Sequence, residues 1–268
     1  MRNLTINSIS ASDLLRRRGI RAAVVPNVMD FLQPGWTSDQ SNREIRNMVG
    51  INEGDIVFLQ ATRITERKAV ETAIRLVAEF NIAARSMTGK NLYNGKAFTG
   101  RVVLVYSGIT ERQSRDYRLK LDDLASNLSV EVIDIASSSS LTQRAFFESY
   151  SVADIVTYPT IFEGWGNQLL EALVSKKPVA IFRYSVFKSD IQDSGISFID
   201  LGDQYGYKEG LVEIPDWNIK NAVKDISELL FDQERYREVT ERNFELGREK
   251  FSFETLSEII QELIADLA

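Results

Sequence analysis

Residues 158–171, YPTIFEGWGNQLLE, form the stretch around which the rest of the chain is organised. A short apolar segment, residues 153–157, precedes this stretch, and an amphipathic run, residues 168–174, overlaps its end. One proline and two glycines interrupt regular structure between the two. The pattern therefore predicts a strand, a tight loop and the start of a helix.

A junction of this kind favours an anion, because backbone N–H groups and the positive end of the helix dipole face the ligand. Two carboxylates nevertheless flank the loop, Glu163 before the glycines and Glu171 eight positions later. Acids beside an anion site fit if they accept hydrogen bonds from hydroxyl groups, as a sugar or a ribose would supply. The plainer interpretation makes Glu163 a helix-capping acid and Glu171 a solvated helix residue.

Glu163 and Glu171, with Gly164 and Gly166 between them, resemble the E-x7-E region of retaining glycosyltransferases of the family 4, or group 1, type. The similarity continues through residues 172–179. It implies a GT-B enzyme that transfers a hexose from a nucleotide-diphosphate sugar to an acceptor with retention of anomeric configuration. In that family Glu163 would contact the donor sugar and act in catalysis, and Glu171 would hold the ribose.

Two cations follow the first predicted strand of the main domain, residues 56–60. Arg63 and Lys68 lie five positions apart across a loop between strand and helix, and such loops line the ligand edge of a parallel sheet. Their spacing resembles the GR-x4-K motif that holds the donor diphosphate in the family, although Thr62 stands where glycine is usual. A planar guanidinium and a compact ammonium suit phosphate oxygens, so both are candidate catalytic residues. Alone, the pair would be an ordinary solvated helix start.

The resemblance also implies further donor contacts and a mechanism. Transfer moves negative charge onto the leaving diphosphate, and the two cations with nearby backbone N–H groups would stabilise it without a metal or another cofactor. No Asp-x-Asp motif of the metal-dependent type is present. The base is expected near Ile135, after the third strand. The substrate-binding residues of the loop are expected to be Gly164, Trp165, Gly166 and Asn167.

Strands and helices alternate along most of the chain, which predicts an α/β fold with a Rossmann-like, doubly wound parallel sheet. Strands are predicted at residues 56–60, 102–106, 130–134, 154–157, 178–182 and 196–199. Helices are predicted at residues 67–85, 111–127, 141–150, 167–175 and 186–192, followed by a helical C-terminal part from residue 215. Residues 86–100, rich in Gly, Asn and Lys, are expected to be a surface loop without a function.

Residues 1–29 are expected to be the tail of an N-terminal domain that this chain otherwise lacks, together with a linker. They predict a strand at residues 3–9, a helix at residues 14–18 and a strand at residues 20–25, too little to close a core. Val25-Pro26-Asn27-Val28 also resembles the IPNG segment between the two GT-B domains. The alternative is an extra edge element on a single domain. Residues 30–268 would then be the nucleotide-sugar-binding domain with its C-terminal helices.

Composition limits the chemistry that is open to the chain. Its 268 residues contain no histidine and no cysteine, which excludes Ser-His-Asp and Cys-His catalysis and disulfides. A net charge of −6 argues against nucleic acid as a partner. No signal segment or membrane span is evident, so a cytoplasmic location is expected. The donor is expected to be a UDP- or GDP-hexose, and the acceptor cannot be identified from the residues.

Two other functions stay open at this point. A non-catalytic module could bind nucleotide sugars or a partner protein with the same cleft. A phosphatase or receiver domain would need an aspartate at the end of the first strand of the sheet, and Gln60 stands there instead.

The last helix carries apolar residues that could cover the absent domain or pack in the core. They are Phe251, Phe253, Leu256, Ile260 and Leu263.

Overall fold

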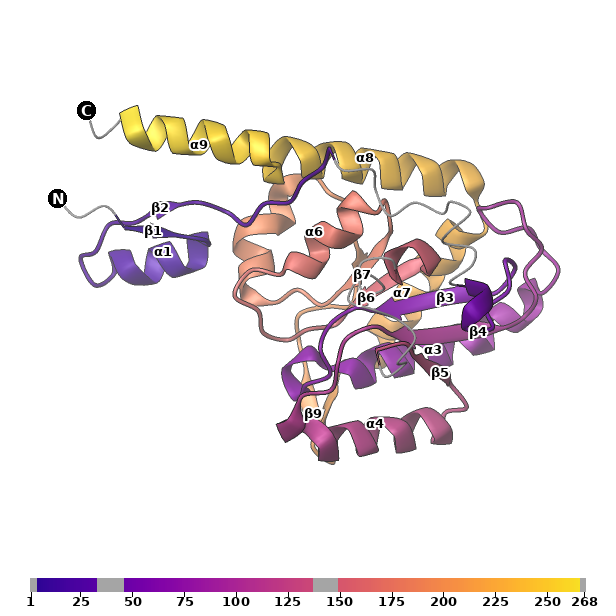
Figure 1. The fold of residues 1–268 in the computed structure, drawn as a ribbon. Coiled ribbons are helices and arrows are strands. Elements are labelled where there is room, and N and C mark those ends of the chain that lie inside the picture. The colour runs from indigo at the N-terminus through magenta and orange to yellow at the C-terminus, as the bar shows by residue number, and fades with distance from the viewer. Residues whose placement is uncertain (1–3, 33–45, 137–148, 266–268) are drawn as a thin grey trace.

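A computed structural model describes residues 4–32, 46–136 and 149–265, which form a parallel sheet with helices on both faces (Figure 1). Six strands are hydrogen-bonded in the order β5-β4-β3-β6-β7-β8, and every pair is parallel. The reversal of strand order at β3 is typical of a doubly wound sheet. The strands are β3 Ile56–Gln60, β4 Val102–Tyr106, β5 Glu131–Asp134, β6 Ile155–Tyr158, β7 Val179–Ile181 and β8 Ile199–Asp200.

Continuous apolar sequence explains the central strands. All five residues of β3 and all five of β4 are buried, as expected where helices cover both faces of a sheet. The two strands align with Ile56 opposite Val102. The last predicted strand is shifted, because β8 begins at Ile199 rather than at residue 196. Asn243 bonds both the backbone N–H and the carbonyl oxygen of Ser197, at 2.8 Å each, which keeps that residue out of the ladder.

The predicted helices that fall on described residues are present, with revised starts. Residues 66–68 form a 3-10 turn and Ala69 has a φ of 47°, so the first helix of the sheet domain begins at Val70. The segment predicted at residues 186–192 contains a π-helical turn, Phe187–Ile191. Most of the helix predicted at 141–150 lies outside the described residues. The helices of the domain are α3 Val70–Ala84, α4 Arg115–Asn127, α6 Asn167–Val174, α7 Asp216–Leu230, α8 Gln233–Phe251 and α9 Phe253–Ala265.

Alternate residues of β3 face two separate hydrophobic cores. Ile56 and Phe58 belong to the core under α3, α4 and α7, whereas Val57 and Leu59 belong to the core under α6 and the end of α8. The two layers of helices lie on opposite faces of the sheet (Figure 1). This arrangement holds the sheet rigidly and fixes the loops that leave its strands.

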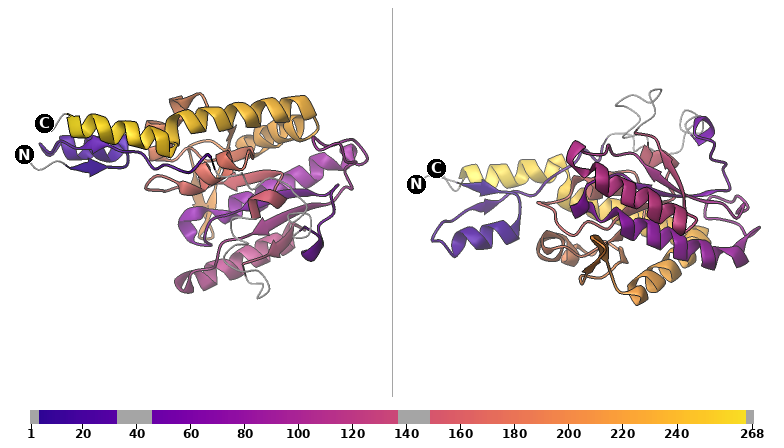
Figure 2. Two further views of the ribbon diagram at one scale, coloured as in Figure 1. Left: turned by 45° about the horizontal axis from the view of Figure 1, so that its top comes forward. Right: turned by 90° about the horizontal axis from the view of Figure 1, so that it is seen from below.

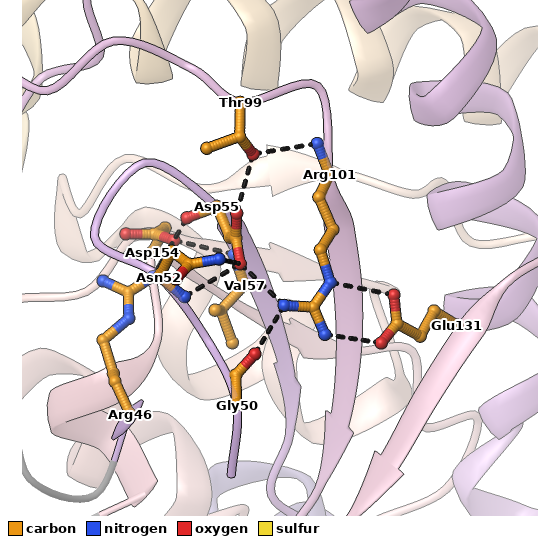
Figure 3. Close-up of polar contacts among 9 residues, drawn as sticks. All are labelled: Arg46, Gly50, Asn52, Asp55, Val57, Thr99, Arg101, Glu131 and Asp154. Atoms are coloured by element: carbon orange, nitrogen blue, oxygen red, sulfur yellow. Dashed lines mark hydrogen bonds and ion pairs between the residues drawn. The ribbon is translucent and has the colours of Figure 1, made fainter. Parts of the chain in front are cut away.

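The amino edge of the sheet, where the parallel strands begin, is closed by a polar network (Figure 3). Arg101, one residue before β4, donates to both carboxylate oxygens of Glu131 at 3.0 and 2.6 Å and to Asp55 at 2.8 Å. Asp55 is fully buried and also accepts from the Thr99 hydroxyl at 2.6 Å. Each buried charge in this part of the edge therefore has an opposite charge or a donor within contact distance.

Asp154 extends the network to the start of β6. Its carboxylate accepts from the Val57 backbone N–H at 2.7 Å, from Arg46 at 3.3 Å and from the Tyr93 hydroxyl at 2.7 Å (Figure 3 shows the first two). Asp154 is 1% exposed, so these contacts replace water as its hydrogen-bond donors.

Residues 86–100 lie mostly on the surface, as expected, but Leu92 and Phe98 anchor the segment in the core. Asn91 pairs with Ala97 in an antiparallel bridge, which turns the segment into a short hairpin. Leu92 and Phe98 are buried in the core beneath α3, and the Tyr93 ring stacks on Tyr236 at 3.7 Å. Polar residues dominate this sequence, but three apolar side chains are enough to anchor it.

Residues 4–24 form a separate small unit. Strands β1 Thr5–Ile6 and β2 Ala23–Val24 pair with each other in parallel, and α1 Ile9–Arg16 connects them. The helix begins earlier than predicted, because the Ser8 hydroxyl caps it by accepting from the Ala11 N–H at 3.2 Å. The unit extends away from the sheet domain beside α9 (Figures 1 and 2).

The last helix, α9, has no buried residue in its span. Phe251, just before it, is 5% exposed and packs in the core, but Phe253 and Ile260 are 53% and 43% exposed. Of the two expectations for this helix, core packing therefore applies to Phe251 and is wrong for Phe253 and Ile260.

Candidate functional site

The carboxyl edge of the sheet, where the strands end, brings two predicted loops together. β3 and β6 are neighbours, so the loop after Gln60 and the loop after Tyr158 leave the sheet side by side. The Ile161 N–H donates to the Arg67 carbonyl oxygen at 3.0 Å, and the Arg67 guanidinium donates to the Phe162 carbonyl oxygen at 3.0 Å. Backbone bonds between the loops thus fix the positions of their charged side chains.

Glu163 lies directly against two cations of the other loop. The Lys68 ammonium donates to one oxygen of the Glu163 carboxylate, and Arg67 contacts the other oxygen at 3.0 Å. The Thr160 hydroxyl lies 3.5 Å from the same carboxylate. Glu163 is therefore not a helix-capping acid, and no side chain caps the N-terminus of α6.

Lys68 is a buried cation among other cations. It is 3% exposed, and burial is the main cause that lowers its pKa to about 7, followed by the positive charges of Arg67 and Arg63. The carboxylates of Glu171 and Glu111 act in the opposite direction. A contact with Glu163 also favours the charged form. A further negative charge beside Lys68 would therefore be favourable, because it would oppose the effects of burial and of the neighbouring cations.

Arg63 reaches the same edge without touching Glu163. Its guanidinium pairs with Glu111, on the loop after β4, at 2.5 Å, and its side chain is 57% exposed. Of the four side chains predicted to meet at this edge, Lys68 and Glu163 are in direct contact, whereas Arg63 pairs with Glu111. The Arg63 charge nonetheless acts on Lys68 through space.

Glu171 is buried in the second turn of α6 and is not a solvated helix residue. It is 7% exposed and accepts a hydrogen bond from the Tyr150 hydroxyl at 2.5 Å. Burial raises the pKa of its carboxyl group, and the Tyr150 hydrogen bond and the Lys68 charge partly offset that rise. The charges of Glu171 and Lys68 therefore interact, so both predicted acids act on the same cation, Lys68.

The glycines of the loop have different roles in the structure. Gly166 has a φ of 119°, and a Cβ there would lie 2.6 Å from the Tyr184 hydroxyl and 2.9 Å from the Tyr158 hydroxyl. A Cβ on Gly164 would meet nothing within 4 Å. Gly166 is therefore required for the turn, whereas Gly164 leaves open space above the loop.

Of the two other predicted loop residues, Trp165 is buried, whereas Asn167 is exposed and bonded to the N-terminal unit. The Trp165 side chain is 2% exposed and packs edge-on against Phe251 at 5.1 Å, so only its backbone can contact a ligand. The Asn167 side chain accepts from Asn27 at 2.5 Å, and Asn27 in turn accepts from Asn7 at 3.1 Å. These amides tie the N-terminal unit to the first residue of α6.

The predicted base-binding position is occupied by buried backbone. Ile135 is 4% exposed, and its N–H donates to the Tyr106 carbonyl oxygen at 2.9 Å. A ligand could use only its carbonyl oxygen, and residues 137–148, which follow it, are outside the described part.

Gln60 bonds to Thr62 and Thr157 at 2.7 Å each, inside the protein. That arrangement offers no nucleophile for phosphatase or receiver chemistry.

Sequence reasoning missed several residues of this edge. Arg67, Thr160, Tyr150 and Glu111 are not among the residues predicted for this edge. Arg67 and Thr160 lie beside predicted residues in the same two loops, so their position was a usable signal. Tyr150 and Glu111 come from other elements, and nothing in their local sequence marks them.

Two properties concern the described residues as a whole. Within residues 4–32, 46–136 and 149–265, no group of three or more His, Cys, Asp or Glu side chains has the arrangement needed for a metal ion. None of the helices described there combines the length and the apolar character that crossing a membrane requires.

Comparison with known families agrees with the fold. The model of the family "Glycosyl transferases group 1" matches residues 41–245, which is most of the chain. The chain therefore belongs to the group 1 glycosyl transferase family. The matched region contains both loops of the carboxyl edge and both glutamates.

Two curated relatives carry the same name. The chain is 43% identical over 260 residues to a mannosylglucosylglycerate synthase of Thermotoga maritima, a match that covers 97% of the chain and 60% of the relative. It is 37% identical over 258 residues to the mannosylglucosylglycerate synthase of Petrotoga mobilis, covering 93% and 59%. The chain thus spans about three fifths of the length of these relatives.

Solved structures share the architecture at low identity. HepE of Anabaena, solved in complex with UDP and glucose, matches with a TM-score of 0.71 and 15% identity over 98% of the chain and 63% of that protein. This likeness confirms the predicted fold class, an α/β domain with a parallel sheet like those of GT-B glycosyltransferases.

Proposed function

We propose that the chain is the donor-binding part of a retaining glycosyltransferase that uses a nucleotide-diphosphate sugar. The observation that carries the proposal is Lys68, a buried ammonium group beside Glu163 with two further cations close by. Perturbed titratable groups of this kind mark functional sites more often than structural ones. Membership of the family supports the same conclusion.

A diphosphate would complete the charge balance of this edge. Arg63 is exposed and can exchange its pairing with Glu111 for phosphate oxygens, to which its planar guanidinium is matched. Lys68, whose side chain is buried, supplies a second positive charge. Gly164 leaves room above the loop, where the backbone N–H groups at the start of α6 add partial positive charge. The diphosphate would therefore lie between the two loops.

The glutamates would bind the hydroxyl-bearing ends of the donor. Glu163, held by Lys68 and Arg67, accepts hydrogen bonds from the sugar and places its anomeric carbon above the edge. Glu171 accepts from the ribose, with Tyr150 fixing the carboxylate from behind. As the bond to the anomeric carbon breaks, Arg63 and Lys68 stabilise the negative charge that develops on the leaving diphosphate.

The names of the relatives narrow the donor and acceptor of this proposal. Mannosylglucosylglycerate contains a mannosyl group on glucosylglycerate, so the transferred hexose would be mannose and the acceptor glucosylglycerate. The acceptor side would be formed by residues outside this chain, since the relatives are longer. Residues 1–29, tied to Asn167 through Asn27, would connect the two parts. The isolated chain should then bind nucleotide weakly and transfer little or no sugar.

Calorimetry with UDP, GDP, ADP and their sugars tests the donor site directly. Glu171→Ala and Arg63→Ala should each weaken the binding of the preferred nucleotide about tenfold, the effect of losing one charged contact. The exposed Asp123→Ala, on α4, serves as a matched control and should bind as the parent does. Unchanged binding in both site variants would place the nucleotide elsewhere.

A further inference from the structure

A second pocket lies at the amino edge of the sheet, on the opposite side from the donor loops. It has a volume of about 320 Å³ and opens between the C-terminal end of α6, the start of α8 and the hairpin of residues 86–100. Its charged lining is mostly positive, in a chain whose net charge is −6. The charged residues that line it are Arg46, Lys176, Lys177, Arg237 and Glu241.

Lys177 is the feature of this pocket that needs an explanation. It is 9% exposed, yet its ammonium makes no hydrogen bond or ion pair with any described residue. Burial lowers the pKa of Lys177 to about 8; the nearby Asp154 carboxylate opposes this shift, and the positive charge of Arg46 adds to it. Asp154 is already bonded to Val57, Tyr93 and Arg46. The Lys177 Nζ is not among the fully buried polar atoms, so it is open to the pocket, where a ligand of opposite charge could reach it.

Other polar groups of the pocket are also without partners. The Ser175 hydroxyl and the Arg46 Nε are both buried and have no hydrogen-bond partner in the described part of the chain. Arg237 is exposed and forms no ion pair among the described residues. The one acidic side chain of the lining, Glu241, is held by Lys176 at 2.7 Å. Donors thus outnumber acceptors, which is the condition for an anion.

We propose that this pocket binds a phosphate group, either as free phosphate or at the end of a small phosphomonoester. Lys177 would face the dianion from the floor of the pocket, and Arg237 would close over it from α8. An ammonium and a guanidinium are common phosphate ligands. The pocket is separated from the donor site by the length of α6, so the two anion sites are independent.

Phosphate titration followed by NMR of 13C-labelled tyrosine rings tests the proposal. Tyr93 and Tyr236 line the pocket and report on it locally. At constant ionic strength, phosphate and glycerol 3-phosphate should shift both rings to saturation, and glycerol should not. Equal affinity for the two phosphates would assign free phosphate, and tighter binding of the ester would assign a phosphomonoester. No shift with either compound would overturn the site and leave a water-filled pocket.

Variants separate this site from the donor site. Lys177→Gln should weaken the phosphate response of Tyr93 and Tyr236 about tenfold or more. Arg237→Gln alters an exposed side chain that does not support the fold, and it should weaken the response about threefold. Lys68→Gln, at the carboxyl edge, should leave the response within twofold of the parent. An unchanged affinity in Arg237→Gln and in folded Lys177→Gln would contradict the proposal, whatever the outcome for nucleotides.

Discussion

Charged side chains gather at both edges of the sheet, but their pairing differs. Along the network of Figure 3, Asp55, Arg101 and Glu131 satisfy one another, and Asp154 is enclosed by three donors. At the carboxyl edge Lys68 and Arg67 both pair with Glu163, and the positive charge of Arg63 also acts on Lys68. The first arrangement holds strands in place, whereas the second leaves positive charge available to a ligand.

This difference shows how structural and functional charges can be told apart. Buried pairs whose hydrogen bonds are complete are sensitive to the loss of either partner, because the remaining charge is left without compensation. Crowded like charges lower stability, and a ligand of opposite sign relieves them. The charged residues of the Figure 3 network should therefore respond to mutation through stability, and those of the two carboxyl-edge loops through binding.

The largest effect is expected for Asp154→Ala at the amino edge. The change leaves the Val57 N–H, the Tyr93 hydroxyl and Arg46 without their acceptor, inside the protein. The free energy of unfolding should fall by about 3–5 kcal/mol, measured by urea denaturation. Asp123→Ala, an exposed acid on α4, should change it by less than about 0.5 kcal/mol. Equal stability of the two variants would show that the network has no structural role.

An intermediate effect is expected for Gly166→Ala at the carboxyl edge. Alanine disfavours a φ of 119°, and its Cβ would collide with two tyrosine hydroxyl groups. Unfolding free energy should fall by about 1–3 kcal/mol. Gly164→Ala is the matched control, since its Cβ meets open space, and thermal melts of both variants should differ clearly. A stable Gly166→Ala protein would show that the turn adapts.

Lys68→Gln should change stability little although the residue is buried. Loss of the contact with Glu163 is offset by relief from the charges of Arg67 and Arg63, and Arg67 still holds the carboxylate. We expect a change below about 1 kcal/mol in urea denaturation, in contrast to Asp154→Ala. A loss as large as that of Asp154→Ala would make Lys68 a structural residue and erase the difference between the edges.

The smallest effect concerns the pH dependence of the amino edge. Hydrogen bonds from Arg101 lower the pKa of Glu131, so its contribution to stability is present above about pH 4.5 and disappears as pH falls through the lowered value. Because the side chain is 47% exposed, solvent limits this contribution to a few tenths of a kcal/mol. The difference in melting temperature between the parent and Glu131→Gln should therefore shrink between pH 6 and pH 3. A constant difference would mean that the pair is not formed.

Much of the fold follows from local patterns, and the exceptions come from distant contacts. The apolar runs at residues 56–60 and 102–106 are strands in the structure because helices cover both faces. The shifted start of β8 depends on Asn243, which lies far along the chain and whose binding to Ser197 no local pattern reveals. The same applies to residues 86–100, where Leu92 and Phe98 reach the core.

The candidate site was predictable to the extent that it lies in the two loops. The resemblance of the two loops to the family's motifs indicated Lys68 and Glu163, which meet in the structure. It did not indicate that Glu111 holds Arg63, or that Tyr150 holds Glu171, because these partners come from other elements. Local sequence identifies which side chains reach an edge, but their pairing is decided by the whole fold.

Nucleotide affinity of Lys68→Gln tests the central claim most directly. Calorimetric titration of GDP and UDP into the parent chain and into this variant measures whether the buried ammonium serves a diphosphate. We predict that the variant remains folded and binds the preferred nucleotide at least about tenfold more weakly. Equal affinity in parent and folded variant would contradict the assignment of the carboxyl edge as the donor site.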